Sequence, residues 1–510
     1  MLIKQAKSLK SSIILVCLLF SSYLVAQDKN EASAVILQKL TQMEKEIATL
    51  KEQLKVVSQS KDAKPAVNPE KKIDESLFKP NSQPEIKDKV DTDSQVLNDK
   101  RIKELGQFGI TYRSAGVSND TMRLGAYGES VFGRKQSGDG WNNGFDAKRI
   151  VLLGTYPIAE DIIFNTEIEF EHGGIAKDAD DKLNGAIEVE QVFVDFRVND
   201  NFTWRSPGVD IVPVGYVGLF HEPTQFYSTN RPEIYAGLIP ATWFTSSTGA
   251  YGKIVDGLNY QFQISSGLED AGTTADEEGG SVPTGGYDAG ISGSESLKLS
   301  RSPIGDNTQL GNSLGYALRL AYETPIKGLA GSSSIYYTGD VSPRGAYGTD
   351  PNGTERLLGS SNLALFDTEL RYRIPKTGFE LRTEYVHTAL GNPDNLRANN
   401  DGDVTNNVGD AMYGYSFETA YHMPLSKKQS QQWDLVPFYR YSRINLQTGG
   451  AGGSDIDASS GAGEKDYHTV GFSLFPTPKV VLKIDYQLIQ DSDNQTADEK
   501  ALLGSVGFFF

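Results

Sequence analysis

The chain has 510 residues, a formal net charge of −17 at pH 7 and one cysteine, Cys17. An excess of acidic residues argues against a nucleic-acid-binding protein, because nucleic acids are themselves negatively charged. Glycine, tyrosine and phenylalanine are abundant, with 52, 24 and 23 residues, yet only 38% of the residues are hydrophobic. No long apolar run follows residue 26, so the composition favours alternation of apolar and polar residues over a large globular core.

Residues 1–26 have the pattern of a signal peptide. Three lysines precede an apolar run from Ile13 to Phe20, and Ala26 is a plausible cleavage point. The run is shorter than the roughly 20 apolar residues that a membrane-spanning helix needs. Because Cys17 lies inside this segment, the mature chain would contain no cysteine, which excludes disulfides and Cys-ligated metals.

Residues 27–60 are predicted to form a coiled-coil helix in the periplasm. Apolar residues follow one another at alternating spacings of four and three, which is a heptad seam. A helix packed on its own domain would show a similar stripe, but the sequence offers no adjacent domain. The heptad seam consists of Ile36, Leu40, Met43, Ile47, Leu50, Leu54 and Val57. Residues 61–104 are expected to be a flexible linker, since prolines alternate there with charged and polar residues.

Residues 105–510 are predicted to be all-β and to form an antiparallel transmembrane β-barrel. Apolar and polar residues alternate with a period of two in stretches of about 9–13 residues, long enough for tilted strands to cross a bilayer. We count sixteen such stretches. They are 122–133, 146–157, 162–172, 189–199, 209–219, 248–255, 257–266, 312–324, 328–338, 362–374, 378–388, 411–423, 434–446, 466–475, 479–490 and 501–510.

The lengths of the connections also indicate an outer-membrane barrel. Connections after odd-numbered strands are mostly long, whereas those after even-numbered strands are mostly short, as at 325–327, 375–377 and 476–478. Barrels of this class have long loops outside and tight turns in the periplasm. A soluble β-sandwich would also alternate, but its loops would not sort in this way. An even number of strands returns both ends of the barrel to the periplasm.

The segment 501–510 is predicted to be the closing strand. Its period of two places Val506, Phe508 and Phe510 on the lipid face. Phe510 would then lie at the periplasmic interface, where aromatic girdles occur.

The polar faces of the strands would meet inside the barrel. Burying so many charges in a dry core is costly, and sixteen strands enclose an aqueous channel, so we expect water in the lumen. Several arginines on neighbouring strands could attract anions, opposed by an acidic wall at Glu167 and Glu169. For any single residue, a structural cross-strand ion pair is the simpler alternative. The predicted pore-lining residues are Arg149, Glu167, Glu169, Arg197, Lys253, Arg319, Arg371, Arg373, Arg382, Arg440 and Lys483.

The segment Gly218-Leu-Phe-His-Glu-Pro223, followed by Ser228, resembles the phosphate-selective porin O and P family. The strand pattern and the coiled coil add to this resemblance. It implies a trimeric outer-membrane porin whose third long loop opens at this segment and folds into the pore. The constriction-loop candidates are then His221, Glu222, Arg231 and Glu233, with His221 standing where the family has a lysine-like residue.

The sequence therefore predicts a passive channel for small hydrophilic solutes, with anions such as phosphate as candidates. Its expected partners are outer-membrane lipids, these solutes and two further copies of the chain, and no cofactor is expected. A structural or adhesive barrel with a plugged lumen is an alternative.

An outer-membrane enzyme is a further alternative, which would need a Ser–His or comparable site. His422 and Ser416 share the lumen face but lie about 20 Å apart along the strand. No catalytic residue or metal ligand is therefore predicted. Residues 399–403 are rich in oxygen atoms that could hold Ca²⁺, although such runs are more often solvated turns.

Overall fold

The computed structural model describes residues 122–137, 140–173, 187–199, 201–240, 242–268, 273–275, 281–283, 297, 313–342, 347–349, 355–357, 359–399, 408–425, 433–448, 463–491 and 498–510. The predicted signal peptide, coiled coil and linker lie outside these residues, as does most of the Ca²⁺ candidate at 399–403. In the part of the chain that is described, no helix has the length and apolar character needed to cross a membrane.

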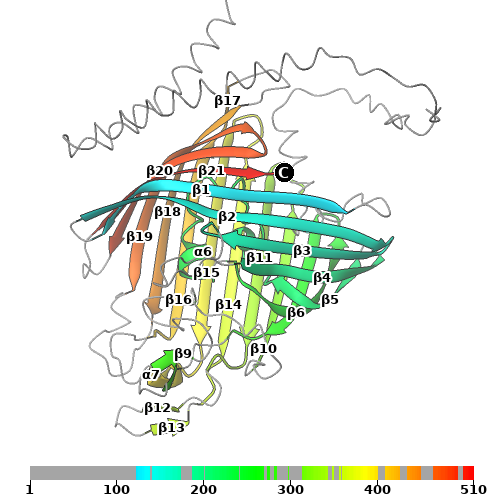
Figure 1. Cartoon of the computed structure of the whole chain (residues 1–510), viewed down its shortest axis with the longest axis vertical. Coiled ribbons are helices and arrows are strands. Elements are labelled where there is room, and N and C mark those ends of the chain that lie inside the picture. The colour runs from blue at the N-terminus through cyan, green and yellow to red at the C-terminus, as the bar shows by residue number, and fades with distance from the viewer. Residues whose placement is uncertain are drawn as a thin grey trace, which may run out of the picture. The chain divides into compact units, whose positions relative to one another are not determined.

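The described strands form a closed antiparallel barrel of sixteen strands, which confirms the predicted fold class (Figure 1). Each wall strand pairs with its neighbour in chain order, and the last strand pairs with the first. The wall consists of β1 (Arg123–Ser137), β2 (Gly140–Ala159), β3 (Ile162–Glu171), β4 (Ile187–Asn199), β5 (Phe202–Ile211), β6 (Phe244–Val255), β7 (Leu258–Ser266), β10 (Leu314–Glu323), β11 (Leu329–Thr338), β14 (Leu363–Arg373), β15 (Phe379–Leu390), β16 (Ala411–Tyr421), β18 (Asp434–Thr448), β19 (Glu464–Thr477), β20 (Val480–Asp491) and β21 (Glu499–Phe509).

Shorter elements lie between the wall strands. The two-residue β17 (Met423–Pro424) continues β16 and pairs with the same neighbour, β18. Two small hairpins belong to the long loops, β8 (Thr273–Ala275) with β9 (Ser281–Pro283) and β12 (Tyr347–Thr349) with β13 (Glu355–Leu357). The described helices are α5 (Tyr216–Leu219), α6 (Ile234–Gly237) and α7 (Asp394–Asn399).

The fifth strand is the one predicted strand that is wrong in position. The prediction placed it at 209–219, whereas β5 ends at Ile211. Pro207 and Gly208 lie at a register shift in this strand, because proline cannot donate a hydrogen bond to the ladder. Gly215 has a positive φ of 69°, so the chain turns there and leaves the wall. The apolar residues after Ile211, whose pattern predicted a strand, are buried inside the barrel instead.

The first connection is also shorter than predicted. The sequence predicts a loop at 134–145, but residues 134–137 and 140–145 are paired strand, with Arg134 opposite Asn143 and Gln136 opposite Trp141. Arg134 lies over the Trp141 ring at 4.5 Å, and this cation–π contact stabilises the extended hairpin. The hairpin of β1 and β2 therefore extends beyond the predicted strand ends.

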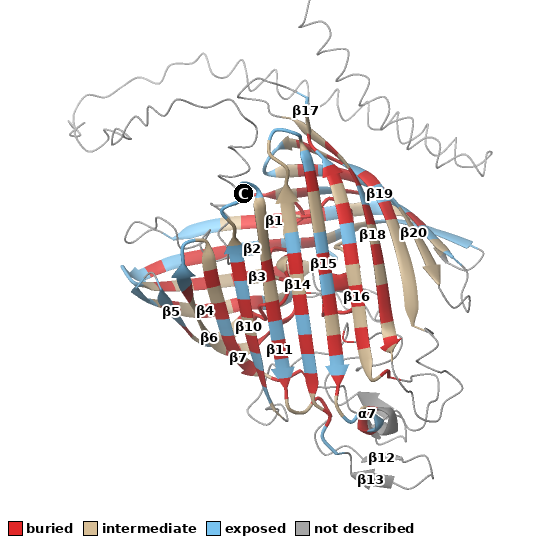
Figure 2. Cartoon of the chain, turned by 180° about the vertical axis from the view of Figure 1, so that it is seen from behind, coloured by how far each residue is buried: buried red, intermediate tan, exposed pale blue. Residues whose placement is uncertain are grey.

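The outer surface of the barrel is apolar, as a lipid-facing wall requires. Burial alternates residue by residue along β14 to β16 (Figure 2). The exposed positions carry large apolar side chains, for example Phe366, Leu370 and Phe417. Water would make such a continuous belt unfavourable, whereas a bilayer accommodates it.

Barrel closure extends to the last residue. The Phe510 N–H donates to the Ala126 carbonyl at 2.8 Å, and the Ala126 N–H donates to the Phe510 carbonyl at 2.9 Å. Val506 and Phe510 are exposed on the outside, as the period of two predicts. Phe509 is buried and packs with Tyr127. The two strands that carry these residues, β21 and β1, lie side by side (Figure 1).

We expect Phe509→Ala to weaken this closure. The substitution removes a buried aromatic ring from the cluster with Tyr127, Val151 and Leu153, a loss of about 3 kcal/mol in unfolding free energy. Denaturant titration of the barrel refolded in lipid vesicles measures the change. Phe510→Ala is the control, since its side chain is 61% exposed. Equal effects of the two variants would contradict a closing role for the inner ring.

Candidate pore and its inward loop

The segment between β5 and β6 folds into the barrel. We call residues 212–243 the inward loop; residue 241 is outside the described part. The loop contains α5 and α6. α6 packs against β16 and β18, two wall strands from the later part of the sequence (Figure 1). Its side chains contact wall strands from both ends of the sequence. The lumen is therefore narrowed by a segment attached to the wall at several points.

One part of the inward loop is buried in an apolar cluster. Loop side chains such as Phe226, Ile234 and Trp243 pack with wall residues of β10 to β18. Trp243 lies edge-on to Tyr336 of β11, with ring centroids 4.5 Å apart. This region is a dry core inside the barrel, which the sequence analysis did not expect. The predicted water-filled lumen therefore cannot extend through this part of the ring.

A buried ion pair attaches the middle of the loop to β18. Arg440 donates two hydrogen bonds of 3.0 Å to Glu233, and it also donates to Ser228 at 2.8 Å and to Glu418 at 3.0 Å. Ser442 donates to Glu233 at 2.7 Å. Burial alone would raise the pKa of Glu233, but Arg440 outweighs burial and leaves this pKa below its usual range. Glu233 therefore remains a carboxylate inside the barrel.

A second set of contacts joins the loop to β20. The Lys483 ammonium donates to the Ser228 carbonyl at 2.8 Å and lies 3.7 Å from the Phe226 ring centroid. The Thr229 N–H donates to the Asp485 carboxylate at 2.6 Å. Cations of the wall thus cover an aromatic face of the loop as well as its backbone carbonyls.

A third contact lies at the end of the barrel that carries the short turns. His422, between β16 and β17, contacts Asp434 through Nδ1 at 2.6 Å and Glu380 through Nε2 at 3.2 Å. Tyr227 of the loop donates to Glu380 at 3.0 Å and also lies 3.0 Å from His422 Nε2. Burial alone would lower the pKa of His422, but the hydrogen bonds to Asp434 and Glu380 outweigh it, so this pKa is raised.

A fourth contact joins the loop to β1 and β2. His221 Nε2 lies 2.6 Å from the Tyr127 hydroxyl, and Arg149 donates to the His221 carbonyl at 2.9 Å. Burial lowers the pKa of the His221 imidazole to about 4, and the positive charge of Arg231 adds to this shift. At neutral pH His221 is therefore an uncharged imidazole.

The predicted pore-lining residues fall into three groups. Most are buried among contacts, those on β14 and β15 are half-buried, and those near the short turns are exposed. The buried group is Arg149, Glu167, Glu169, Arg319, Arg440 and Lys483; the half-buried group is Arg371, Arg373 and Arg382; the exposed group is Arg197 and Lys253. For the buried group, the structural ion-pair alternative describes the contacts better than a water-exposed pore lining does.

The constriction-loop candidates all lie in the inward loop. His221 and Glu233 are buried, whereas Glu222 and Arg231 are half-buried. Arg231 donates to Thr242 within the loop at 2.6 Å. Sequence reasoning missed Tyr227 and Glu190, because nothing in the pattern of the loop identifies which wall residue an inward side chain meets.

The half-buried arginines lie together on two neighbouring wall strands. Arg371 and Arg382 lie opposite each other on β14 and β15. The Arg371 guanidinium lies 3.1 Å from the Tyr216 ring centroid, and Arg382 lies 4.3 Å from that of Tyr227. Arg382 also donates to the Gln225 carbonyl at 3.0 Å. These contacts orient the guanidinium groups along the edge of the inward loop.

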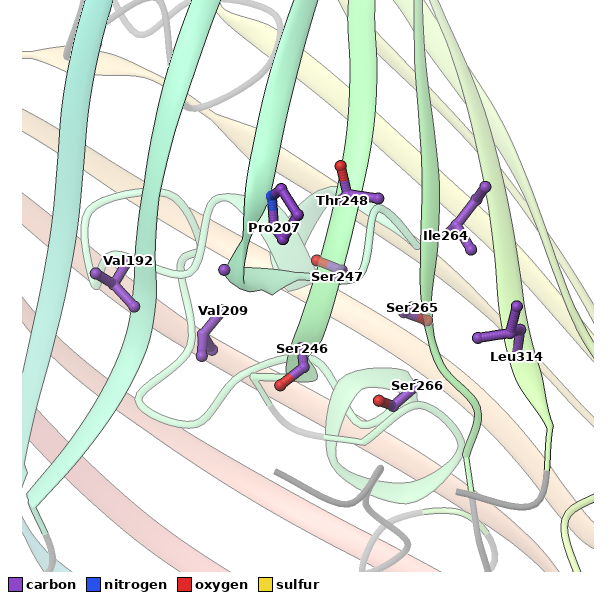
Figure 3. Close-up of a pocket in the computed structure, with 11 residues that line it drawn as sticks. Val192, Pro207, Val209, Ser246, Ser247, Thr248, Ile264, Ser265, Ser266 and Leu314 are labelled. Carbon is purple, nitrogen blue, oxygen red and sulfur yellow. The ribbon is translucent and has the colours of Figure 1, made fainter. Parts of the chain in front are cut away.

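A cavity of about 500 Å³ lies among β4 to β7 and β10 (Figure 3). It occurs where the β5 ladder is broken near Pro207, so neighbouring side chains do not fill the wall. Its lining includes Ser246, Ser265 and Ile264, and no lining residue is ionisable. This cavity therefore offers no charge with which to select an ionic solute.

No family model matches this chain. A protein of Aquifex aeolicus (strain VF5), described as uncharacterized, is 26% identical over 370 residues, which is 72% of this chain and 75% of that protein. The outer membrane channel DcaP of Acinetobacter baumannii is a similar solved structure, at 10% identity and a TM-score of 0.46, covering 78% of this chain and 100% of that one. OprB of Pseudomonas putida is similar at 10% identity and a TM-score of 0.47, with coverage of 76% and 94%. The assignment of the fold depends on the strand pairing of this chain.

We expect Glu233→Ala to release the inward loop. Removing Glu233 takes away two charge-assisted hydrogen bonds and leaves Glu418 as the remaining carboxylate partner of the buried Arg440, so we expect a cost of up to about 3–5 kcal/mol in unfolding free energy. Denaturant titration and trypsin cleavage at the loop measure the effect. The control is Arg443→Ala, which breaks a more exposed pair with Asp466 and should cost less than about 1 kcal/mol. Similar costs for both variants would show that Glu233 does not hold the loop.

The contact at His422 predicts a dependence of stability on pH. Because the folded-state pKa is raised, His422 stabilises the fold fully below the unfolded value of about 6.5, and this contribution is lost as pH rises through the folded pKa. The facing groups are Glu380, Asp434 and Tyr227, with Arg373 opposing the charge. His422→Gln should therefore lose most stability relative to wild type at acidic pH. A difference between the two proteins that does not change between pH 5.5 and 8.5 would contradict this assignment.

Proposed function

We propose that this protein is an outer-membrane porin, a passive channel for small hydrophilic solutes. The observation that carries the proposal is the division of a sixteen-strand ring between an apolar exterior and a charged interior. A ring of this size encloses more space than wall side chains fill. The inward loop narrows that space and is held by buried contacts, as expected for a fixed constriction. The predicted signal peptide agrees with export, and the coiled coil would then lie in the periplasm.

Small anions such as phosphate are the proposed preferred solutes. Arg371, Arg373 and Arg382 are half-buried on adjacent strands, and guanidinium groups match the oxygens of phosphate and carboxylate. The resemblance of the 218–223 segment to the phosphate-selective porin O and P family supports the same preference. That resemblance and the predicted coiled coil also support a homotrimer in the membrane.

We infer a channel and not an enzyme from the use of the two lumen histidines. His221 and His422 contact tyrosine and carboxylate groups that fix the inward loop. A second candidate function is a structural barrel with a plugged lumen. The apolar cluster between the loop and the wall favours it, because this cluster excludes water from part of the ring.

Conductance in planar bilayers separates these functions. A porin gives stepwise conductance, and a trimer gives steps in groups of three. A barrel that is folded by its heat-modified gel mobility but never conducts would identify the plugged alternative.

The arginines of β14 predict the charge preference of the open channel. Arg371→Gln with Arg373→Gln should lower the ratio of anion to cation permeability by about twofold at low salt, where screening is weak. The reversal potential in a salt gradient measures this ratio. Arg197→Gln is the matched control, since it removes one exposed cation near the short turns. An unchanged ratio in the double variant would argue against selection by this surface.

A further inference from the structure

Three side chains of the types that bind metal ions lie close together where the inward loop contacts β3 and β4. Glu167 of β3, Glu190 of β4 and His221 of the loop each offer one atom, and these atoms all lie within 4.8 Å of one another. His221 Nε2 is 3.5 Å from Glu190 Oε2 and 4.0 Å from Glu167 Oε1. All three side chains are almost completely buried. The proposed pore function uses none of these groups as a ligand set.

Glu190 is the unusual member of this cluster. Its exposed fraction is 0%, and among the described residues no nitrogen or hydroxyl group donates a hydrogen bond to its carboxylate oxygens; its neighbour there is another carboxyl group, that of Glu169. A buried carboxylate without a donor is costly and calls for an explanation. Two described arginines act on Glu190, and both have other partners. Arg231 donates to Thr242 at 2.6 Å, whereas Arg149 contacts Glu129 at 3.0 Å and donates to the His221 carbonyl.

The tautomer of His221 increases the need for a positive charge. Nδ1 lies 3.2 Å from the Gly218 carbonyl, and a carbonyl oxygen can only accept, so Nδ1 carries the proton. In the neutral ring Nε2 is then a bare lone pair that faces Glu190. The Tyr127 hydroxyl reaches both Nε2 at 2.6 Å and Glu167 at 3.0 Å, but it has one proton to donate. Acceptors therefore outnumber donors in either arrangement.

We propose that Glu167, Glu190 and His221 form a divalent transition-metal site, of the kind that takes Zn²⁺, which joins the inward loop to the barrel wall. An imidazole with two carboxylates is a donor set suited to such ions, whereas Ca²⁺ and Mg²⁺ prefer oxygen ligands alone. Ligands about 2.0–2.2 Å from a tetrahedral ion lie roughly 3.5 Å apart, close to the two separations measured from Nε2. The hydrogen bond from Nδ1 to the Gly218 carbonyl is the second contact that orients a metal-binding histidine.

A metal ion bound at this site would hold the inward loop against the barrel wall. His221 belongs to the inward loop, whereas Glu167 and Glu190 belong to adjacent wall strands. A bound ion would therefore add a cross-link between loop and wall at the edge opposite Arg440. This inference is independent of the proposed porin activity, because it concerns binding to the folded chain and needs no conductance.

The test uses tag-free, full-length protein folded in detergent, freed of metal with a chelator and titrated with Zn²⁺ alone. We expect one ion per chain by calorimetry and by elemental analysis, with a rise in the unfolding temperature. Glu190→Gln and His221→Gln should each weaken binding by about 10–100-fold. Substitution with Co²⁺ should give visible absorption bands of a site containing one imidazole, and His221→Gln should abolish them.

His172→Gln is the matched control. His172 Nδ1 also faces a carboxylate, Asp146, at 3.0 Å, but it is exposed and lies just beyond the end of β3, outside the buried cluster. Zn²⁺ binding that is absent in wild type, or unchanged in both Glu190→Gln and His221→Gln, would overturn the proposal. So would equal affinity for Ca²⁺ and Zn²⁺. If His221→Gln fails to fold, Glu190→Gln decides, since it keeps the size of the side chain.

Discussion

Complete pairing of the backbone around a closed ring is the constraint on which the rest of this structure depends. A strand edge exposed to lipid would leave its N–H and C=O groups without partners, so the last strand must pair with the first. The reciprocal hydrogen bonds between Phe510 and Ala126 continue that pairing to the final residue. Closure in turn requires that each strand present one face to lipid and the other to the interior. It is this requirement that brings many charged side chains together inside the barrel.

The charged side chains inside the barrel are compensated by ion pairs and hydrogen bonds within the protein, and not by water alone. Arg440 meets Glu233 and Glu418, Lys483 meets loop carbonyls, and Arg149 meets Glu129. Two of these four interactions, those of Arg440 with Glu233 and of Lys483 with the Ser228 carbonyl, join the wall to the inward loop. The loop thus supplies counter-charges and carbonyl acceptors to residues that would otherwise be solvated. The Glu190 region is one exception, because neither oxygen of its buried carboxylate accepts a hydrogen bond from a nitrogen or hydroxyl group of the described residues.

The wall was predictable from sequence because the period of two is a local property of each strand. Residues 479–490, for example, alternate throughout, and the structure places β20 at Val480–Asp491. The path of residues 212–219 was not predictable, since an apolar run reads alike in a strand and in a buried loop. Individual contacts could not be predicted either, because the residues in contact are far apart in the sequence. Tyr227 and His422, for example, are separated by 195 positions. Parity indicates that a side chain points inward, but not what it meets there.

The long-range contacts of the inward loop have a consequence for the order of assembly. Thr229 and Asp485 are 256 positions apart, and the partners of the loop lie on strands from both halves of the chain. The loop leaves the wall after β5, so most of its partners are synthesised later. The full set of loop contacts therefore needs a wall that is formed as far as β20, which carries Lys483 and Asp485. The docked loop is thus a property of a nearly complete barrel and not of its first strands.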